Sequence, residues 1–305
     1  MTIQRAAPTR VAARSVSGWA QLHQVAWWEW RRLTTNRTAW LASSVALGCF
    51  GFILLVRNRW PLSDAVVLVG GTANGQLAEL AYDLMPMFGI MLAFVAVDAV
   101  AIDYQQRTHE LLMTSALPSW VYVGGRYLAR LTAFLALALV LLIAQLGVNV
   151  ALARLEPTYP APQLTANVLL WVVVVVPAAV TLASLGVALG SLLPRYSVVP
   201  KVALSIAWVI LALDNDPRDL GWRDYWNPTS AGVAKLLLLQ LTQLSRPITQ
   251  GVQSPTEQAA QVLQLQTQPL DLSPWLGPFV TLAAVGVLLV IGAAVSFRRF
   301  RGLRE

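Results

Sequence analysis

Residues 168–193 read VLLWVVVVVPAAVTLASLGVALGSLL and carry no charged side chain. A hydrocarbon layer of about 30 Å is crossed by roughly 20 helical residues, because each residue of an α-helix adds about 1.5 Å. This run exceeds that length, so it predicts a transmembrane helix. The composition of the whole chain agrees: of its 305 residues, 56% are hydrophobic and 12% are charged, whereas a soluble domain has about 25% charged residues.

Five further apolar runs predict an all-α, polytopic integral membrane protein with six transmembrane helices. These runs are residues 39–56, 84–102, 127–152, 198–213 and 276–297. The run at 198–213 is the shortest, and we expect it to tilt deeply or to be locally broken. The expected segments are an N-terminus at 1–38, five helices within 39–213 with a connection at 103–126, an outer segment at 214–275, a sixth helix at 276–297 and a basic tail at 298–305.

The distribution of basic residues predicts the side of the membrane on which the termini lie. With six spans, fifteen of the 22 Lys and Arg residues fall on the side of the termini and seven on the other side. Cytoplasmic loops carry the excess of Lys and Arg. We therefore expect both termini in the cytoplasm and a multi-pass protein of the bacterial plasma (inner) membrane. Segment 214–275 is then extracytoplasmic, and the sequence leaves open whether it contains a re-entrant helix.

The segment before the first span predicts an amphipathic interfacial helix. Apolar side chains recur at spacings of three and four residues, with the charged ones, Glu29 among them, turned elsewhere; the apolar positions are Trp19, Leu22, Ala26, Trp30 and Leu33. This pattern is typical of a helix on the inner membrane surface, and a cytosolic extension of the first span is the alternative. The residues expected to hold the helix there are Trp27, Trp28, Trp30, Arg31 and Arg32.

Three other tryptophans have expected positions. Trp171 and Trp275 lie near the outer ends of their spans, where the apolar ring and polar N–H of an indole suit the headgroup layer. Trp208 lies within a span and is expected to pack between helices.

Missing motifs exclude several kinds of chemistry. No phosphate-binding loop of the Gly-x-x-x-x-Gly-Lys-Ser/Thr type occurs, and neither lysine, Lys201 or Lys235, follows such a loop. The two histidines, His23 and His109, are far apart in sequence, and Cys49 is the only cysteine. We therefore expect no metal site, no disulfide and no enzyme acting alone. The basic residues stand in short loops beside apolar runs, which argues against nucleic-acid binding.

The connection between the second and third spans is the most informative polar stretch. Residues 98–131 read DAVAIDYQQRTHELLMTSALPSWVYVGGRYLARL. A polar group ends the second span, a short amphipathic block and a turn at Pro118 follow, and Gly124, Gly125 and Arg126 precede the third span. This order predicts a helix-turn-helix held just below the membrane. A partner that pushed on it would move both spans together.

In this stretch the chain resembles the permeases of type-2 ABC transporters. The matching residues are Asp98, Asp103, Thr108, Glu110, Leu111, Leu112, Gly125 and Arg126. Six spans, a basic amphipathic N-terminal segment and a larger outer loop before the last span also agree with that family. The chain departs from the family pattern at Gln105, Gln106, Arg107 and His109, and Pro118 is displaced by two residues.

The resemblance implies that residues 103–126 are a coupling loop, whose central helix inserts into a separate ATPase subunit. The ATPase-coupling residues that it implies are Thr108, His109, Glu110, Leu111, Leu112, Met113, Thr114 and Ser115. It also implies an exporter assembled from this permease, an ABC ATPase subunit and a second permease copy, most simply as a homodimer in membrane lipid. ATP and Mg²⁺ would be bound by the ATPase, and no cofactor by this chain. A loop that only joins two helices is the alternative.

Four charged residues are candidates for a gating or ion-pair role: Asp98, Asp103, Arg126 and Arg130. Asp98 lies near the inner end of its span, within reach of water or of Arg126 and Arg130. An ion pair is favoured over a proton relay, because an ion-coupled carrier needs buried ionisable residues in several spans. The alternative to an exporter is a non-transporting anchor or assembly subunit of a larger complex. The substrate cannot be read from the sequence, although spans with so few charges favour a lipid-like or amphipathic cargo.

Overall fold

The computed structural model describes most of the chain as helix. The ranges described are 17–35, 37–57, 84–106, 117–155, 159–214, 220–229, 231–237 and 271–302, together with positions 72, 74, 75, 77, 80 and 239. Every regular element within them is helical. The expected all-α class is confirmed for this part of the protein.

Four helices are long and apolar enough to cross a membrane, judged by length and composition. They are α4 (Met85–Gln105), α6 (Ser119–Leu155), α7 (Leu164–Leu192) and α12 (Ser273–Gly302). The other two expected spans correspond to α2 (Arg37–Arg57), which is apolar over Ser43–Phe52, and α8 (Val198–Leu213), which has 16 residues. α6 begins eight residues before the expected span at 127–152, so Gly124 and Gly125 lie within this helix.

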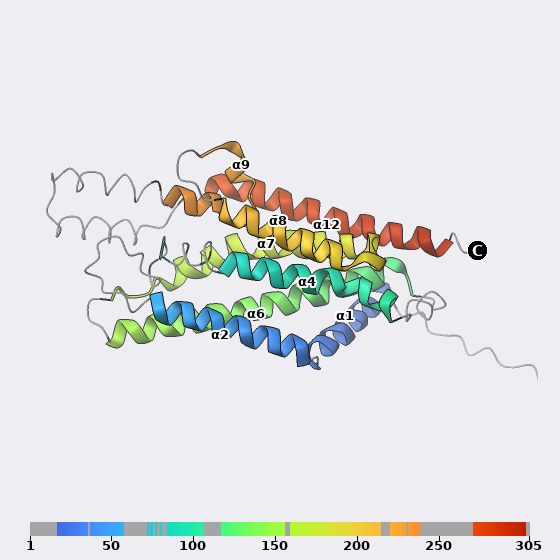
Figure 1. Cartoon of the computed structure of the whole chain (residues 1–305), viewed down its shortest axis with the longest axis horizontal. Coiled ribbons are helices and arrows are strands. Elements are labelled where there is room, and N and C mark those ends of the chain that lie inside the picture. Colours follow the sequence, from blue (N-terminus) through green and yellow to red (C-terminus); the bar gives the residue numbers. More distant parts are fainter. Residues whose placement is uncertain are drawn as a thin grey trace, which may run out of the picture.

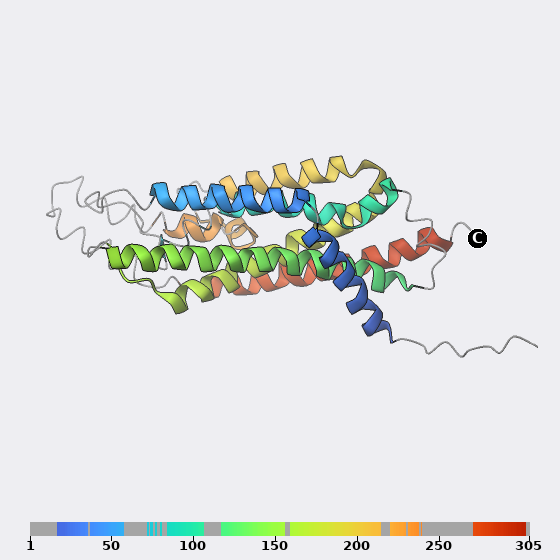
Figure 2. The same cartoon turned by 90° about the horizontal axis from the view of Figure 1, so that it is seen from below.

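The long helices lie side by side along the long axis of the molecule (Figure 1). α7 packs against α4, α6 and α12, while α8 packs mainly on α4. The short 3₁₀ helix η2 (Pro194–Tyr196) connects α7 to α8. α1 (Gly18–Thr35) crosses the bundle obliquely at the end where α12 finishes, and packs on α6 (Figure 2). The described start and finish of the chain are therefore at one end of the bundle.

Small residues allow α4 and α7 to approach closely. Cβ atoms added at Gly186 and Gly190 of α7 would meet Ala96 and Val97 of α4. The two glycines are four residues apart, so they lie on one face of α7. The Gly-x-x-x-Gly spacing is typical of close helix packing in membranes. The α4–α7 contact thus depends on glycine, which has no side chain, at these two positions.

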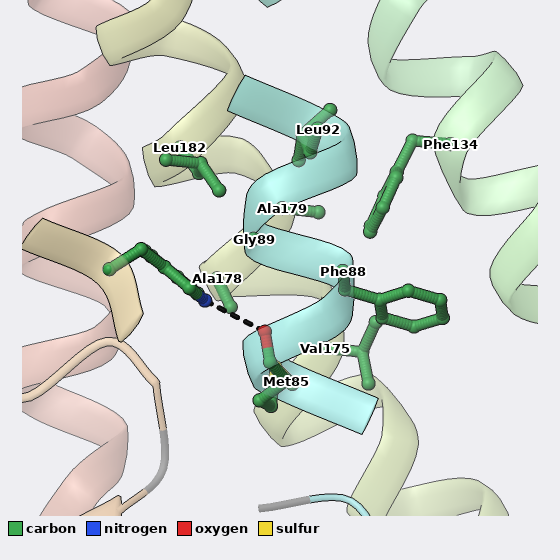
Figure 3. A pocket seen from close by; sticks show the side chains of 10 residues that line it. Met85, Phe88, Gly89, Leu92, Phe134, Val175, Ala178, Ala179 and Leu182 are labelled. Carbon is green, nitrogen blue, oxygen red and sulfur yellow. Dashed lines mark hydrogen bonds between the residues drawn. The ribbon is translucent and has the colours of Figure 1, made fainter. Parts of the chain in front are cut away.

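Trp208 fills the space between α8 and α4. Its indole N–H donates a hydrogen bond of 2.8 Å to the Met85 carbonyl oxygen, and its side chain is buried. Figure 3 shows this bond as a dashed line that ends on Met85, near Gly89, which lies on α4 as Met85 does. A Cβ at Gly89 would overlap the Trp208 ring. The expected packing of Trp208 between helices is confirmed, and the cavity that remains there is only about 10 Å³.

Part of the segment predicted at 214–275 is folded back into the protein. Residues 231–237 are helical and mostly buried, and Val233 belongs to the hydrophobic core. Lys235 pairs with Asp224 of α9 (Trp222–Tyr225) at 3.2 Å, and both side chains are buried. The side chains of Asn227 and Thr229 donate hydrogen bonds to the Leu211 carbonyl oxygen. These bonds satisfy a free backbone group at the end of α8.

Trp171 and Trp275 lie in the first part of α7 and of α12. They are 4% and 1% exposed, so their rings pack inside the bundle. Trp275 packs on Tyr225 of α9, with ring centroids 5.1 Å apart. The segment around α9 covers the start of α12, and this explains why an indole near a helix end is buried.

Candidate functional site

A group of charged side chains lies buried where α1, the end of α4 and the start of α6 meet. We call it the ion-pair cluster, and its members are Glu29, Arg32, Asp103, Tyr122, Arg126 and Arg130. Except for Arg32, each of these residues is at most 7% exposed. A concentration of buried charge of this kind stands out in a protein of such apolar composition.

Glu29 of α1 bridges to two arginines of α6. Its carboxylate lies 2.6 Å from Arg130 Nη2 and 3.7 Å from Arg126 Nη2. Glu29 is the only buried residue of α1. This acid therefore attaches the oblique helix to the bundle.

Asp103, in the last turn of α4, completes the other half of the cluster. Its carboxylate lies 2.5 Å from Arg126 Nη2, and it accepts a hydrogen bond of 2.5 Å from the Tyr122 hydroxyl. Arg126 also donates to the Ala99 carbonyl oxygen of α4. Arg126 thereby joins α4 directly to α6, and through Glu29 to α1.

Arg32 forms the exposed edge of the cluster. Its guanidinium lies 3.7 Å from Asp103 and 3.8 Å from Glu29, and its side chain is 40% exposed. It also donates a hydrogen bond of 3.3 Å to the Gln106 side-chain oxygen, just after α4. Because Gln106 leads into the connection at 107–116, α1 contacts the chain where that connection begins.

The cluster extends to a fourth helix through Tyr122. The Tyr122 ring stacks on Phe297 of α12, with centroids 5.1 Å apart, and the Arg126 guanidinium lies 4.8 Å from the centre of the Tyr122 ring. The last part of α12 is thus packed against the same residues that hold α1 and α4.

Helical spacing and glycine explain how the sequence builds this site. Tyr122, Arg126 and Arg130 are four residues apart, so they project from one face of α6. A Cβ at Gly125 would come within 2.7 Å of Val25 Cγ1, so this glycine allows α1 to lie close to α6. Gly18 likewise faces Trp120. Close backbones bring Glu29 within reach of the two arginines.

The charges of the cluster make it sensitive to the loss of any one member. Two carboxylates face three guanidinium groups, and the Arg130 Nε–H has no hydrogen-bond partner. Burying ions costs several kcal/mol each, and this cost is offset only while the pairs are intact. We therefore expect α1, α4 and α6 to move as one unit.

A second ion pair joins α4 to α8. Lys201 Nζ lies 2.6 Å from Asp98 Oδ1, and the same amine lies 5.8 Å from the centre of the Phe94 ring. The expected partners of Asp98 were Arg126 and Arg130, but the ion pair found for Asp98 is with Lys201. Lys201 lies in the first turn of α8, within the predicted run at 198–213. The sequence prediction missed the pair because the pattern of one run does not show which helix packs beside it.

The expected site residues fall into three groups. Asp103, Arg126 and Arg130 come together in the ion-pair cluster, whereas Asp98 lies in the separate pair. Trp27 and Trp28 are exposed and Trp30 is half-buried. The ATPase-coupling residues 108–115 lie outside the described ranges.

Glu29 is the main residue that sequence reasoning misplaced, because it was expected to turn away from the apolar face of α1. A signal for its true position is present in the spacing. Leu22, Ala26, Glu29 and Leu33 are separated by four, three and four residues, so they share one face. The prediction gave most weight to the bulky indoles near this helix, and so it placed Trp19 on the apolar face. In the structure Trp19 is 75% exposed.

Within the described ranges, no group of three or more His, Cys, Asp or Glu side chains is placed to hold a metal ion. No protein-family model matches the chain, and no curated protein matches it.

Proposed function

We propose that the chain is the permease subunit of an ATP-binding-cassette exporter. Substrate moves across the membrane by alternating access, and the energy comes from a separate ATPase subunit that acts on the connection at 107–116. α2, α4, α6, α7, α8 and α12 form six spans with both termini in the cytoplasm. A second copy of the chain completes the transport path, and ATP and Mg²⁺ bind to the ATPase.

The observation that carries this proposal is the ion-pair cluster. α4 ends before the connection at 107–116 and α6 begins after it, and Asp103 and Arg126 join these two helices at 2.5 Å. Glu29 and Arg32 add α1 to the same unit. A push on the connection would then shift three helices together, as a mechanical coupling between ATPase and permease requires.

Positions of the ion pairs also support a crossing by α2. α1 is bound to the last turn of α4, whereas α4 begins about 30 Å away, since its 21 residues rise about 1.5 Å each. The chain must therefore travel that distance between residues 35 and 85. α2 has 21 residues and leads in the required direction (Figure 1).

Similar reasoning supports a crossing by α8. Lys201, in its first turn, pairs with Asp98 toward the end of α4. Its far end receives hydrogen bonds from Asn227 and Thr229, close to α9, which contacts Trp275 at the start of α12. α8 thus leads from the end of the bundle that holds the ion-pair cluster to the opposite end.

The proposal is tested by asking whether the connection at 107–116 binds an ATPase. The tagged chain is co-expressed with the ABC ATPases of its source organism, and complex formation and ATP hydrolysis in lipid vesicles are measured. We expect a stable complex, and its loss when Leu111 and Leu112 are both replaced by Asp. The matched control is Trp222→Asp, which places an acid at an exposed position (72% exposed) at the other end of the bundle.

A non-transporting anchor subunit is the second candidate. It is favoured by the tight packing between α4, α7 and α8, where the cavity is only about 10 Å³. If the chain is an anchor subunit, the Leu111 and Leu112 substitutions should change neither the composition of the purified assembly nor its rate of ATP hydrolysis. An ATPase complex that survives both substitutions would therefore overturn the exporter proposal.

A further inference from the structure

An apolar groove lies between α1, α2, α4 and α6, next to the ion-pair cluster. Its volume is about 290 Å³, close to the lower end of the range for small-molecule sites, about 300–1,000 Å³. Its walls include Leu47 of α2, Val95 of α4 and Ala136 and Val140 of α6.

The lining of the groove suits a hydrocarbon chain. Aliphatic and aromatic side chains dominate it, and the polar side chains among them are Thr34 and Ser43 and the indoles of Trp30 and Trp40. The Trp40 indole N–H is already engaged, since it donates a hydrogen bond of 2.5 Å to the Thr34 carbonyl oxygen. The walls therefore offer few free polar groups to recognise a polar ligand.

The groove is open on one side to the surroundings of the bundle. A flexible chain of methylene groups is thin enough to enter it from that side.

Positive charge at the junction of α1 and α2 supplies the headgroup preference. Arg31 and Arg37 are exposed and flank Thr34 in sequence, while the nearby acid Glu29 is bound to Arg130. Arg130 lies one helical turn before Phe134 of the groove wall, and its buried Nε–H has no partner. A lipid chain gains little by leaving other lipid chains for an apolar wall. Selectivity must therefore come from the charged headgroup.

We propose that this groove binds an acyl chain of an anionic phospholipid, whose phosphate lies at the arginines of the α1–α2 junction. The site holds α1 against the membrane and does not depend on the chain being a transporter. Zwitterionic lipids would enter the groove with lower affinity, because their headgroups carry no net negative charge to meet Arg37.

The test uses the full chain in nanodiscs that contain trace amounts of a photoactivatable phosphatidylglycerol or of the matching phosphatidylcholine. Crosslinked peptides are identified by mass spectrometry. We expect the phosphatidylglycerol probe to label residues 133–140 of α6 and to exceed the phosphatidylcholine probe about fivefold for each arginine that contacts the phosphate. Equal labelling by the two probes, or labelling spread evenly over the exposed faces of α8 and α12, would overturn the proposal.

Two pairs of variants separate the groove from its rim. Ala136→Phe fills the groove and should abolish labelling, whereas Ala144→Phe, on an exposed position of the same helix, should not. Arg37→Gln should reduce the preference for phosphatidylglycerol about fivefold, whereas Arg223→Gln, exposed near the opposite end, should leave it unchanged. Arg37 is exposed, so its replacement keeps the test decisive even if Ala136→Phe does not fold. A preference unaffected by Arg37→Gln, or a photoactivatable free fatty acid that labels as well as phosphatidylglycerol, would contradict the proposal.

Discussion

At the scale of single residues, a buried charge is useful only while its partners remain. Glu29 is the only acid that α1 contributes to the cluster, and it contacts both Arg126 and Arg130. Removing its charge leaves guanidinium groups buried with one counter-ion fewer. Breaking a buried pair from one side costs about 3–5 kcal/mol, whereas removing both partners costs less.

We predict that Glu29→Gln lowers the free energy of unfolding by about 3–5 kcal/mol. Thermal unfolding followed by circular dichroism in detergent measures this loss. The double variant Glu29→Gln with Arg130→Gln should recover part of it, because the unpaired charge is gone. Asp214→Asn serves as a control, since this side chain is exposed. Equal melting of Glu29→Gln and the wild type would refute the role of the cluster in stability.

Close packing at Gly89 gives a second prediction at this scale. Gly89→Ala should destabilise the protein by about 1–3 kcal/mol, because the added methyl overlaps the buried Trp208 ring. Gly292→Ala in α12 is the matched control, since a Cβ there meets nothing within 4 Å. Alanine favours a helix over glycine, so the control should be neutral or slightly stabilised. Melting curves of the two variants that coincide would contradict this packing argument.

The sequence identified three members of the cluster but not their common partner. Asp103, Arg126 and Arg130 are conspicuous because charge is scarce in and near the spans. Glu29 lies among Trp27, Trp28 and Trp30 in sequence. A helical periodicity that gives most weight to these large side chains predicts that Glu29 faces outward. The close approach allowed by Gly125 decides its environment, and a tertiary contact of this kind is not encoded in the periodicity of one helix.

At the scale of elements, α1 is a helix docked on the protein as well as an amphipathic one. Its Leu22 and Val25 lie over Gly124 and Gly125 of α6, and Glu29 lies over the arginines. Trp27 and Trp28 remain exposed on the side away from α6, where they are free to enter a headgroup layer. The prediction of a surface helix thus accounts for one side of α1, and the contact with α6 occupies the other side.

We predict that Gly125→Val releases α1 from α6. Overpacking by about 1–3 kcal/mol shifts the docking equilibrium by roughly 5-fold to 150-fold. This shift exposes the peptide bonds after Arg31 and Arg32 to trypsin. Limited proteolysis in nanodiscs measures the cleavage rate, and it should rise about tenfold. Gly147→Val, at a position of α6 where a Cβ meets nothing within 4 Å, should leave the rate unchanged. A rate that Gly125→Val does not alter would show that α1 is held by other contacts.

Element boundaries follow the apolar runs where no other interaction intervenes. The bounds of α8 agree with the predicted run at 198–213. α4 and α6 extend beyond their runs, because Asp103, Tyr122 and Arg126 satisfy one another and allow polar turns to continue the helices. The buried position of 231–237 depends on the Asp224–Lys235 pair. A hydrophobicity pattern does not reveal such a pairing.

At the scale of the whole molecule, the ion pairs fix which helix ends lie together. Glu29, Asp103, Tyr122 and Phe297 belong to four helices and meet at one end of the bundle. Ser17 and Gly302 are therefore on one side of the membrane if the helices cross it as proposed, and Trp222 is on the other. Six spans account for this arrangement.

We predict that single cysteines at positions 17 and 302 react with a membrane-impermeant maleimide from one side only, and a cysteine at 222 from the other side. The native Cys49 is first replaced by Ala, since it is exposed. Labelling of intact cells and of inverted membrane vesicles distinguishes the two sides. A cysteine at 302 that reacts from the opposite side to one at 17 would exclude an even number of spans.

α8 has consequences for the bilayer around the protein. With 16 residues it is about 24 Å long, while the hydrocarbon layer measures about 30 Å. Its outer face, which includes Val198, Ile206 and Ile210, is exposed along the whole length. If α8 crosses the membrane as proposed, lipids next to this face compress to match it, at a cost of a fraction of a kcal/mol for each ångström of mismatch. The protein should therefore gather short-chain lipids along α8 and work best in thin membranes.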